Sequence, residues 1–185
     1  MRKPLLVAED LTPRWNLLRL CGVRWQATRY GWLSVVWWAA LGCAVAFVER
    51  LNASQSSWLL EGVASGAVRM LSNVFHSLGH VIAGRAIGSP VHTVLTTSTR
   101  DVIIYERPGT AELQRWRLGR ALGGPAANLA AGCALLLVGC VAHASWAVVA
   151  GVFNVGVGLW TLMPVPSLDG WVIWHSLIRT GRSRA

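Results

Sequence analysis

Four apolar stretches, each about as long as a membrane-spanning helix, most constrain what this chain can fold into. The hydrocarbon core of a bilayer is about 30 Å thick, and a helix needs roughly 20 apolar residues to cross it. The stretches cover about residues 31–48, 58–87, 121–142 and 145–163, and the first carries no charged residue. Hydrophobic residues make up 54% of the 185-residue chain and charged residues only 14%. We therefore predict a mainly α membrane protein with about four transmembrane helices.

The basic residues indicate how such a protein is oriented. Residues 1–29, 85–120 and 175–185 hold 15 of the 17 lysine and arginine residues, whereas the turns between the other spans hold only Arg50. Positively charged loops stay in the cytoplasm, so both termini are predicted to be cytoplasmic, in a bacterial inner or plasma membrane. A net charge of +9 is typical of nucleic-acid binding, but no basic stripe interleaved with aromatics is present. We therefore expect the lipid bilayer, and no nucleic acid, as a partner.

Three regions follow from this pattern. Residues 1–30 form a basic amphipathic segment that we expect on the membrane surface, residues 31–175 form the membrane domain, and residues 176–185 form a basic tail. Within the membrane domain, Val91 to Tyr105 alternates in hydrophobicity and is rich in β-branched residues, which predicts a small cytoplasmic hairpin or sheet. Pro108-Gly109 ends it.

Two features are expected after this insertion. Ala111 to Arg120 predicts a basic surface helix, and Gly123-Gly124-Pro125 predicts a break or a re-entrant start of the third span. The fourth span is expected to end at Pro164.

A histidine pair in the second span is the first sign of chemistry. His76 and His80 are four residues apart, which places both imidazoles on one helix face, able to hold one metal ion. Asp169 follows the fourth span and is either the cap of a following helix or a third ligand. Two histidines and one carboxylate that leave a position open are typical of a catalytic zinc site.

Together these residues resemble the site-2 protease family of intramembrane zinc metalloproteases. That family has H-E-x-x-H on one membrane helix, a G-P-x-x-N turn, and an N-x-x-P-x-x-x-L-D-G type motif on a later helix. The matching segments stand in the same order, as His76-Ser77-Leu78-Gly79-His80, Gly124-Pro125-Ala126-Ala127-Asn128 and Thr161-Leu162-Met163-Pro164-Val165-Pro166-Ser167-Leu168-Asp169-Gly170. The resemblance covers about residues 58–175. It implies a site-2-protease-like core, zinc bound by His76, His80 and Asp169, and support from Gly124, Pro125 and Asn128.

The departures from the family motif are as informative as the matches. Ser77 replaces the glutamate that acts as general base, Thr161 replaces an asparagine, and Trp171 stands where a second glycine is common. General acid–base help is worth about 10² to 10⁴ in rate, and a serine hydroxyl cannot hold the proton near neutral pH. Glu61 lies about 22 Å from His76 along the helix, too far to act as a substitute base. Glu106 and Glu112 in the polar segment could in principle reach back, but nothing in the sequence places them at the site.

Other polar and small residues in the spans have structural interpretations. Asn128 is predicted to bond to the backbone of the broken turn and Asn154 to form an interhelical hydrogen bond. Glycines predict close helix packing at Gly62, Gly66, Gly151, Gly156 and Gly158. His175 is interpreted as a surface residue.

Three hypotheses remain open. The first is a degenerate member of the family that keeps zinc but lacks the base, and that acts as a binding or accessory subunit for a membrane protein partner or a larger membrane complex. The second is an active intramembrane metalloprotease that uses another base. The third is a structural subunit without metal, in which His76, His80 and Asp169 bond to one another.

Overall fold

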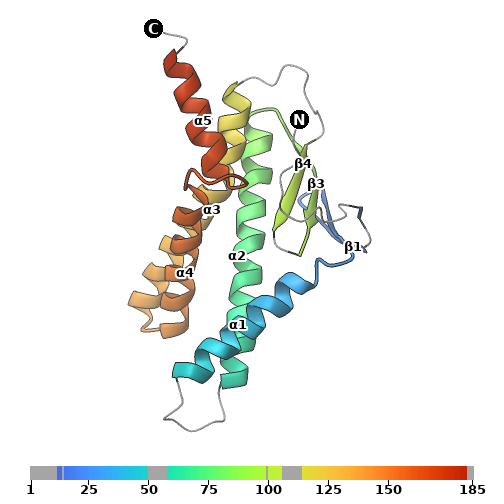
Figure 1. The fold of residues 1–185 in the computed structure, drawn as a ribbon. Helices are drawn as coiled ribbons and strands as arrows, with labels where there is room; N and C mark the ends of the chain where they lie inside the picture. Colours follow the sequence, from blue (N-terminus) through green and yellow to red (C-terminus); the bar gives the residue numbers. More distant parts are fainter. Residues whose placement is uncertain (1–11, 14, 50–57, 99, 106–113, 183–185) are drawn as a thin grey trace. The chain divides into compact units, whose positions relative to one another are not determined.

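The computed structural model describes residues 12–13, 15–49, 58–98, 100–105 and 114–182. Its elements form two compact units, and the boundary between them falls within one helix, after Arg69. Figure 1 shows these elements. In chain order they are β1 (Trp15–Leu20), β2 (Val23–Ala27), α1 (Leu33–Glu49), α2 (Trp58–Ala86), β3 (Val91–Thr96), β4 (Asp101–Tyr105), α3 (Gln114–Val141), α4 (Ser145–Thr161) and α5 (Asp169–Arg182).

The first unit, here called the sheet unit, contains β1, β2, α1, the start of α2 and residues 92–104. The strands lie in the order β1-β2-β3-β4, with β1 antiparallel and β3 parallel to β2. The predicted strands within residues 91–105 are confirmed. The two strands in the N-terminal segment were not predicted, although Val23, Trp25 and Ala27 alternate with Arg24 and Gln26 and are buried in β2.

Small residues let α1 approach the start of α2 within the sheet unit. A Cβ built on Gly62 would come within 2.7 Å of the Cys43 main-chain nitrogen, and one built on Gly66 within 3.1 Å of the Ala39 Cβ. The predicted packing role of both glycines is confirmed. Such close approach of backbones is how helices associate where lipid offers no hydrophobic driving force.

The second unit, here called the helical unit, contains Met70–Val91 and the chain from Tyr105 on. Glycines bring α3 and α4 together along their length. A Cβ on Gly139 would lie 2.7 Å from the Val148 nitrogen, and one on Gly151 would lie 2.8 Å from the Leu136 nitrogen. Gly158 packs in the same way against Leu129, so the predictions for Gly151 and Gly158 are confirmed. The prediction for Gly156 is wrong, because no described atom lies within 4 Å of a Cβ built there.

Helix α3 is continuous, which corrects two predictions. Residues from Gln114 to Arg120 are its first turns rather than a separate surface helix, and Pro125 lies inside it without a break. Residues 106–113, with Pro108-Gly109 and the start of the predicted surface helix, lie outside the described residues. Proline costs the helix one hydrogen bond, here to the Ala121 carbonyl, and packing against neighbouring helices makes this loss tolerable. Pro125 is fully buried among them.

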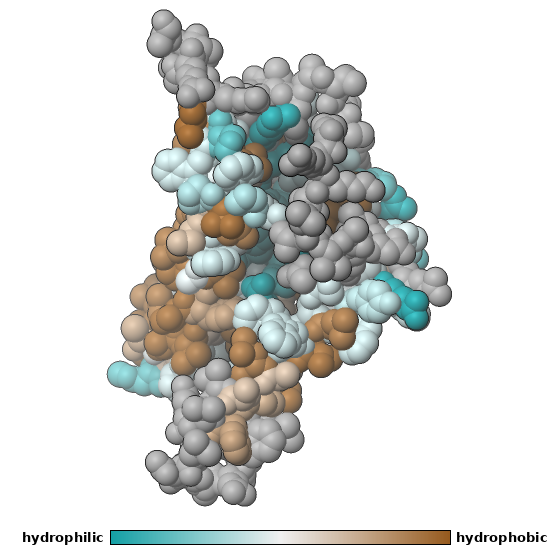
Figure 2. All heavy atoms as spheres, viewed as in Figure 1, coloured by the Kyte–Doolittle hydropathy of each residue, from teal (hydrophilic) through white to brown (hydrophobic). Residues whose placement is uncertain are grey.

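One described helix is long and apolar enough to cross a bilayer, namely Trp116–Val141 within α3. Leu33–Ala44 and Ser145–Thr161 are apolar but shorter. The mainly helical fold with a small sheet is therefore observed, whereas the count of four spans stays a prediction. In the helical unit, apolar side chains gather over α4 and the adjoining part of α3 (Figure 2), where Leu137, Val141, Trp146, Val149 and Val152 are exposed.

Candidate metal centre

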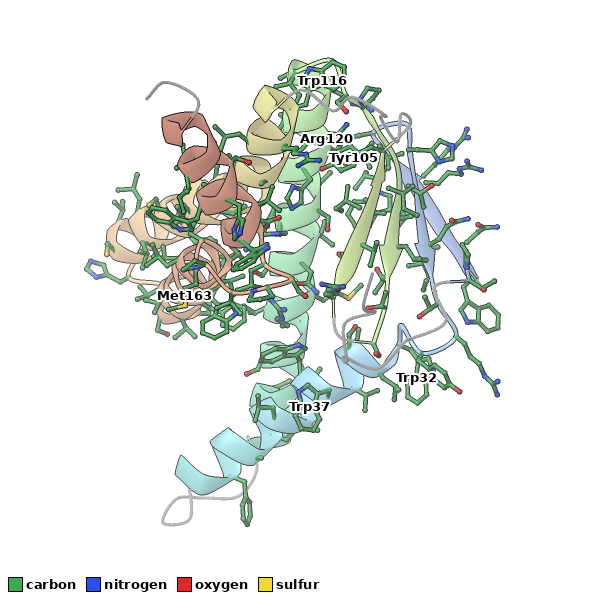
Figure 3. All side chains as sticks on the ribbon, turned by 45° about the horizontal axis from the view of Figure 1, so that its top comes forward. Trp32, Trp37, Tyr105, Trp116, Arg120 and Met163 are labelled. Atoms are coloured by element: carbon green, nitrogen blue, oxygen red, sulfur yellow. The ribbon has the colours of Figure 1, made fainter. Side chains whose placement is uncertain are left out.

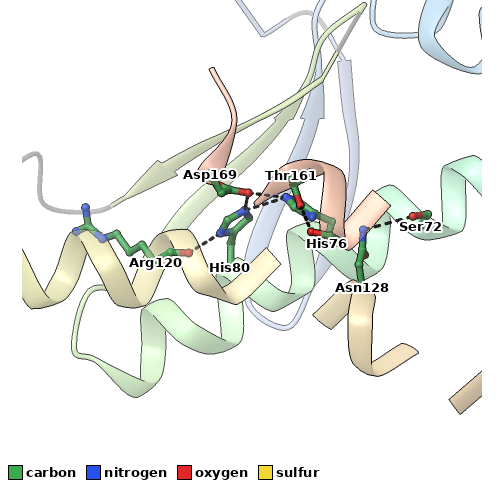
Figure 4. A network of polar contacts seen from close by, with 8 residues as sticks. Ser72, His76, His80, Arg120, Asn128, Thr161 and Asp169 are labelled. Carbon is green, nitrogen blue, oxygen red and sulfur yellow. Dashed lines mark hydrogen bonds and ion pairs between the residues drawn. The ribbon is translucent and has the colours of Figure 1, made fainter. Parts of the chain in front are cut away.

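The two histidines of the motif lie on one face of α2. His76 and His80 are one turn apart, their ring centroids are 4.8 Å apart, and their planes meet nearly edge to face at 78°. His80 is almost completely buried and His76 is 19% exposed. The i, i+4 spacing therefore places the two Nε2 atoms side by side, 3.2 Å from each other (Figure 4).

Asp169 reaches this point because the chain turns sharply between α4 and α5. Residues 162–168 connect the two helices, and Ser167 has a φ of 79°. Gly170 fits directly against the main chain of Leu162 and Met163, where a Cβ would have no room. The indole N–H of Trp174 donates to the Leu162 carbonyl over 3.1 Å. These contacts tie the start of α5 to the end of α4 and hold Asp169, the first residue of α5, beside α2.

The three side chains form a triangle of the size that a metal ion requires. Oδ2 of Asp169 lies 3.0 Å from Nε2 of His76 and 3.5 Å from Nε2 of His80. Zinc ligands at about 2.0–2.1 Å in a tetrahedron are about 3.3 Å apart. The three observed separations fall on both sides of that value, and these are the residues whose ligand atoms cluster in the described part of the chain.

Hydrogen bonding sets the tautomer of His80. Its Nδ1 lies 2.7 Å from the main-chain carbonyl of Arg120. A carbonyl only accepts, so Nδ1 carries the proton, and Nε2 of the neutral ring presents a lone pair to His76 and Asp169. This is the usual arrangement behind a metal-binding histidine. His76 lacks such a supporting bond, because its Nδ1 atom is buried and has no hydrogen-bond partner among the described residues.

The carboxylate of Asp169 is ionised at neutral pH. Burial raises its pKa, but hydrogen bonds and the charges of His76 and His80 outweigh burial and lower the pKa from 3.8 to about 2. One proton on His76 Nε2 can serve only one of its two neighbours, Nε2 of His80 or Oδ2 of Asp169. A cation at the centre of the triangle would satisfy all three donors, so the donor set fits zinc.

Gly124 shapes the same space from α3. A Cβ built on this residue would lie 2.5 Å from Nε2 of His76 and 2.5 Å from Nε2 of His80. Gly123, beside it, packs against the main chain of Gly79 on α2, where a Cβ would lie 2.5 Å from the Gly79 carbonyl oxygen. The closeness of α2 and α3 therefore depends on Gly79 and Gly123, and the close approach of α3 to the two imidazoles depends on Gly124.

Two predicted supporting residues, Asn128 and Asn154, have hydrogen-bond partners other than those expected. Asn128 is fully buried and its amide nitrogen lies 3.5 Å from the Ser72 hydroxyl of α2, so it does not bond to a broken turn. Asn154 donates to the Ala150 carbonyl over 2.8 Å within α4, so the predicted interhelical bond is wrong. Asn128 and Asn154 both lie inside continuous helices, so neither is next to a broken turn. The amide oxygen of each is buried and without a partner among the described residues.

The structure also locates the departures from the motif. Ser77 is fully buried in α2, next to His76 in sequence. The Thr161 hydroxyl donates to the Gly158 carbonyl over 3.0 Å in the last turn of α4. The rings of Trp171 and His175 lie 4.0 Å apart between centroids and are tilted by 42°. His175 is exposed on α5, as predicted. Arg120 was not singled out, because it contributes a main-chain carbonyl, for which side-chain chemistry gives no signal.

Comparison with known proteins supports the fold alone. No family model matches the chain, and no curated protein matches its sequence. Among solved structures, the chain is similar to the site-2 protease from Methanocaldococcus jannaschii. The TM-score is 0.63 over 89% of this chain and 71% of that chain, with 15% identical residues. The predicted site-2-protease-like fold is therefore confirmed. Within it, His76, His80 and Asp169 form a group that could hold a metal ion.

Proposed function

We propose that this chain is an integral membrane protein that binds one zinc ion through His76, His80 and Asp169 but does not hydrolyse peptide bonds. The observation that carries the proposal is the triangle of 3.0, 3.2 and 3.5 Å between the three donor atoms, combined with a serine at residue 77. A zinc ion held there would act as a Lewis acid and activate water.

The missing group is a proton acceptor beside that water. The hydroxyl of Ser77 cannot accept and keep a proton near neutral pH, and Ser77 is fully buried. Asp169 is the only acidic residue in 70–91 and 114–182, and it is one of the three converging donors. Glu106 and Glu112, the remaining candidates for a base, lie outside the described residues. The described part of the helical unit therefore offers no carboxylate to replace the family's glutamate.

Without hydrolysis, the function left to this fold is binding. We propose that the protein holds a membrane protein partner or serves as an accessory subunit of a larger membrane complex. Extensive exposed apolar surface on α3 and α4 supports contact with lipid and with other membrane helices. The basic segments at residues 1–29, 85–120 and 175–185 support a cytoplasmic placement of both termini, in a bacterial inner or plasma membrane.

A cleavage assay tests the non-proteolytic role. Purified full-length protein in detergent, supplied with zinc, is incubated with a panel of labelled single-span membrane substrates. We expect no product above that of the His76→Ala variant. Cleavage that 1,10-phenanthroline abolishes and that the His76→Ala variant lacks would instead establish an active metalloprotease with another base. In that case, Glu106→Gln and Glu112→Gln identify the base.

A further inference from the structure

Arg120 contacts the metal centre with its main chain and the end of α2 with its side chain. Its carbonyl accepts the Nδ1–H bond of His80 over 2.7 Å. Its guanidinium lies over the Tyr105 ring, 3.8 Å from the ring centroid, and donates to the Ser89 hydroxyl. Figure 3 shows Arg120 and Tyr105 side by side. Arg120 therefore connects His80 to an outer pair of partners, Tyr105 and Ser89.

Both outer partners rest on the last turns of α2, just beyond His80. The Ser89 N–H donates to the Gly84 carbonyl over 2.7 Å, and Ser89 is 2% exposed. The Tyr105 ring packs at the same place, since its Cε1 lies 3.5 Å from a Cβ built on Gly84. The side chain of Arg120 is thus fixed to the same helix that carries His80, about one turn further along.

These contacts define the position of α3 against α2 at the height of the metal centre. This turn of α3 lacks one internal hydrogen bond, because Pro125 has no N–H to offer the Ala121 carbonyl. An external contact therefore matters more here than in a regular helix. We propose that Arg120 is a positioning residue for the metal centre. Its side chain holds its own carbonyl where that carbonyl keeps His80 in the Nδ1–H tautomer, with Nε2 directed toward His76 and Asp169.

The proposal rests on the zinc site described above and extends it to the surroundings of one ligand. Partners behind a metal-binding histidine typically change metal affinity by about 10–100-fold. A purely structural arginine would change the thermal stability of the protein but not the zinc affinity or the His80 tautomer of the folded protein. These two quantities therefore separate the two roles.

The test compares four variants in full-length protein in detergent. Arg120→Met removes the charge and both outer contacts, and Tyr105→Leu removes the ring. Tyr105→Phe keeps a ring for the cation to lie over, and Arg117→Met is the matched control, because Arg117 is exposed on the same helix. Zinc affinity is measured by competition with a fluorescent chelator. The His80 tautomer is measured in the metal-free protein from its imidazole ¹⁵N chemical shifts.

We expect Arg120→Met and Tyr105→Leu to weaken zinc binding by about 10–100-fold and to shift His80 toward the Nε2–H tautomer. Tyr105→Phe and Arg117→Met should match the wild type in both measurements. If Arg120→Met does not fold, Tyr105→Leu and Ser89→Ala carry the test. An unchanged tautomer and unchanged zinc affinity in the folded variants would overturn the proposal. Absence of zinc from the wild type would instead overturn the proposed function, and the tautomer of the metal-free protein would still decide the role of Arg120.

Discussion

Nε2 of His76 and Oδ2 of Asp169 lie 3.0 Å apart, although 93 residues separate the two in the chain. Helix α2 supplies the first and the start of α5 supplies the second. A contact over such a separation requires the turn at residues 162–168 and the packing of α5 against α3. The fold thus brings together donors that a local sequence pattern cannot join.

Replacing Asp169 by asparagine tests the carboxylate as a ligand. Asp169→Asn keeps the size of the side chain but removes the charge, so zinc affinity should fall by more than the roughly 100-fold that loss of a supporting contact can cost. Chelator competition measures the affinity. His175→Ala is the control, because this histidine is exposed on α5 and its ring contacts Trp171. Equal zinc affinity of Asp169→Asn and the wild type would remove Asp169 from the ligand set.

Gly124→Ala tests whether the space beside the imidazoles is the metal position. The added methyl group would lie 2.5 Å from Nε2 of both His76 and His80, closer than real contacts allow. We expect zinc content to drop well below that of the wild type, as measured by elemental analysis. Gly156→Ala adds the same methyl group where no described atom lies within 4 Å, and it should keep the wild-type zinc content. A Gly124→Ala protein that is folded and retains full zinc would place the ion elsewhere.

Restoring the general base should restore chemistry. Ser77→Glu places a carboxylate next to His76 in sequence, and the gain in cleavage of a membrane substrate should be about 10²- to 10⁴-fold over the wild-type background. The glutamate would occupy a fully buried position, so lower thermal stability is expected as well. Ser77→Gln has the same shape without the proton acceptor and should remain inert. If zinc is bound and Ser77→Glu is equally inert, the geometry has changed along with the base.

The metal site and the metal-free fold should respond differently to acid. Zinc needs neutral imidazoles and an ionised carboxylate, so its affinity should fall as the pH is lowered and protons compete with the metal for the ligands. The pKa of Asp169 is lowered to about 2, so Asp169 stays ionised near neutral pH. In metal-free protein, its contribution to stability is present above its ordinary pKa of 3.8 and is lost as the pH falls toward 2. Thermal unfolding of the wild type and Asp169→Asn should therefore converge only below about pH 4. Convergence already at pH 6 would contradict the lowered pKa.

Much of the site was predictable because its residue types are rare in apolar helices. His76, His80 and Asp169 stand out against hydrophobic surroundings, and a polar group in such a place needs a partner. Alternation of β-branched residues likewise predicted β3 and β4. Strands β1 and β2 were missed because the arginines of residues 1–29 were interpreted as one face of a surface segment. The signal for β2 was the alternation of Val23, Trp25 and Ala27 with Arg24 and Gln26.

The helix interior was harder to predict, for a physical reason. A glycine–proline pair lowers helix propensity, so a break at Gly124-Pro125 was expected, yet packing overrides propensity and α3 runs through it. Asn154 was assigned to a neighbouring helix, but a carbonyl one turn back lies nearer and satisfies its amide. The sequence shows that a polar group is present, but it does not show which partner the group bonds to. The partner depends on the final distances between helices.

The zinc content of purified wild-type protein tests the central claim most directly. Protein prepared without metal-affinity resin is reconstituted with zinc, dialysed against weak chelator and analysed by elemental mass spectrometry, with His76→Ala alongside. We predict about one zinc per chain in the wild type, as for a site of three protein ligands with one open position, and a substoichiometric amount in His76→Ala. Substoichiometric zinc in both proteins would contradict the account and would leave His76, His80 and Asp169 as a hydrogen-bonded cluster in a structural membrane subunit.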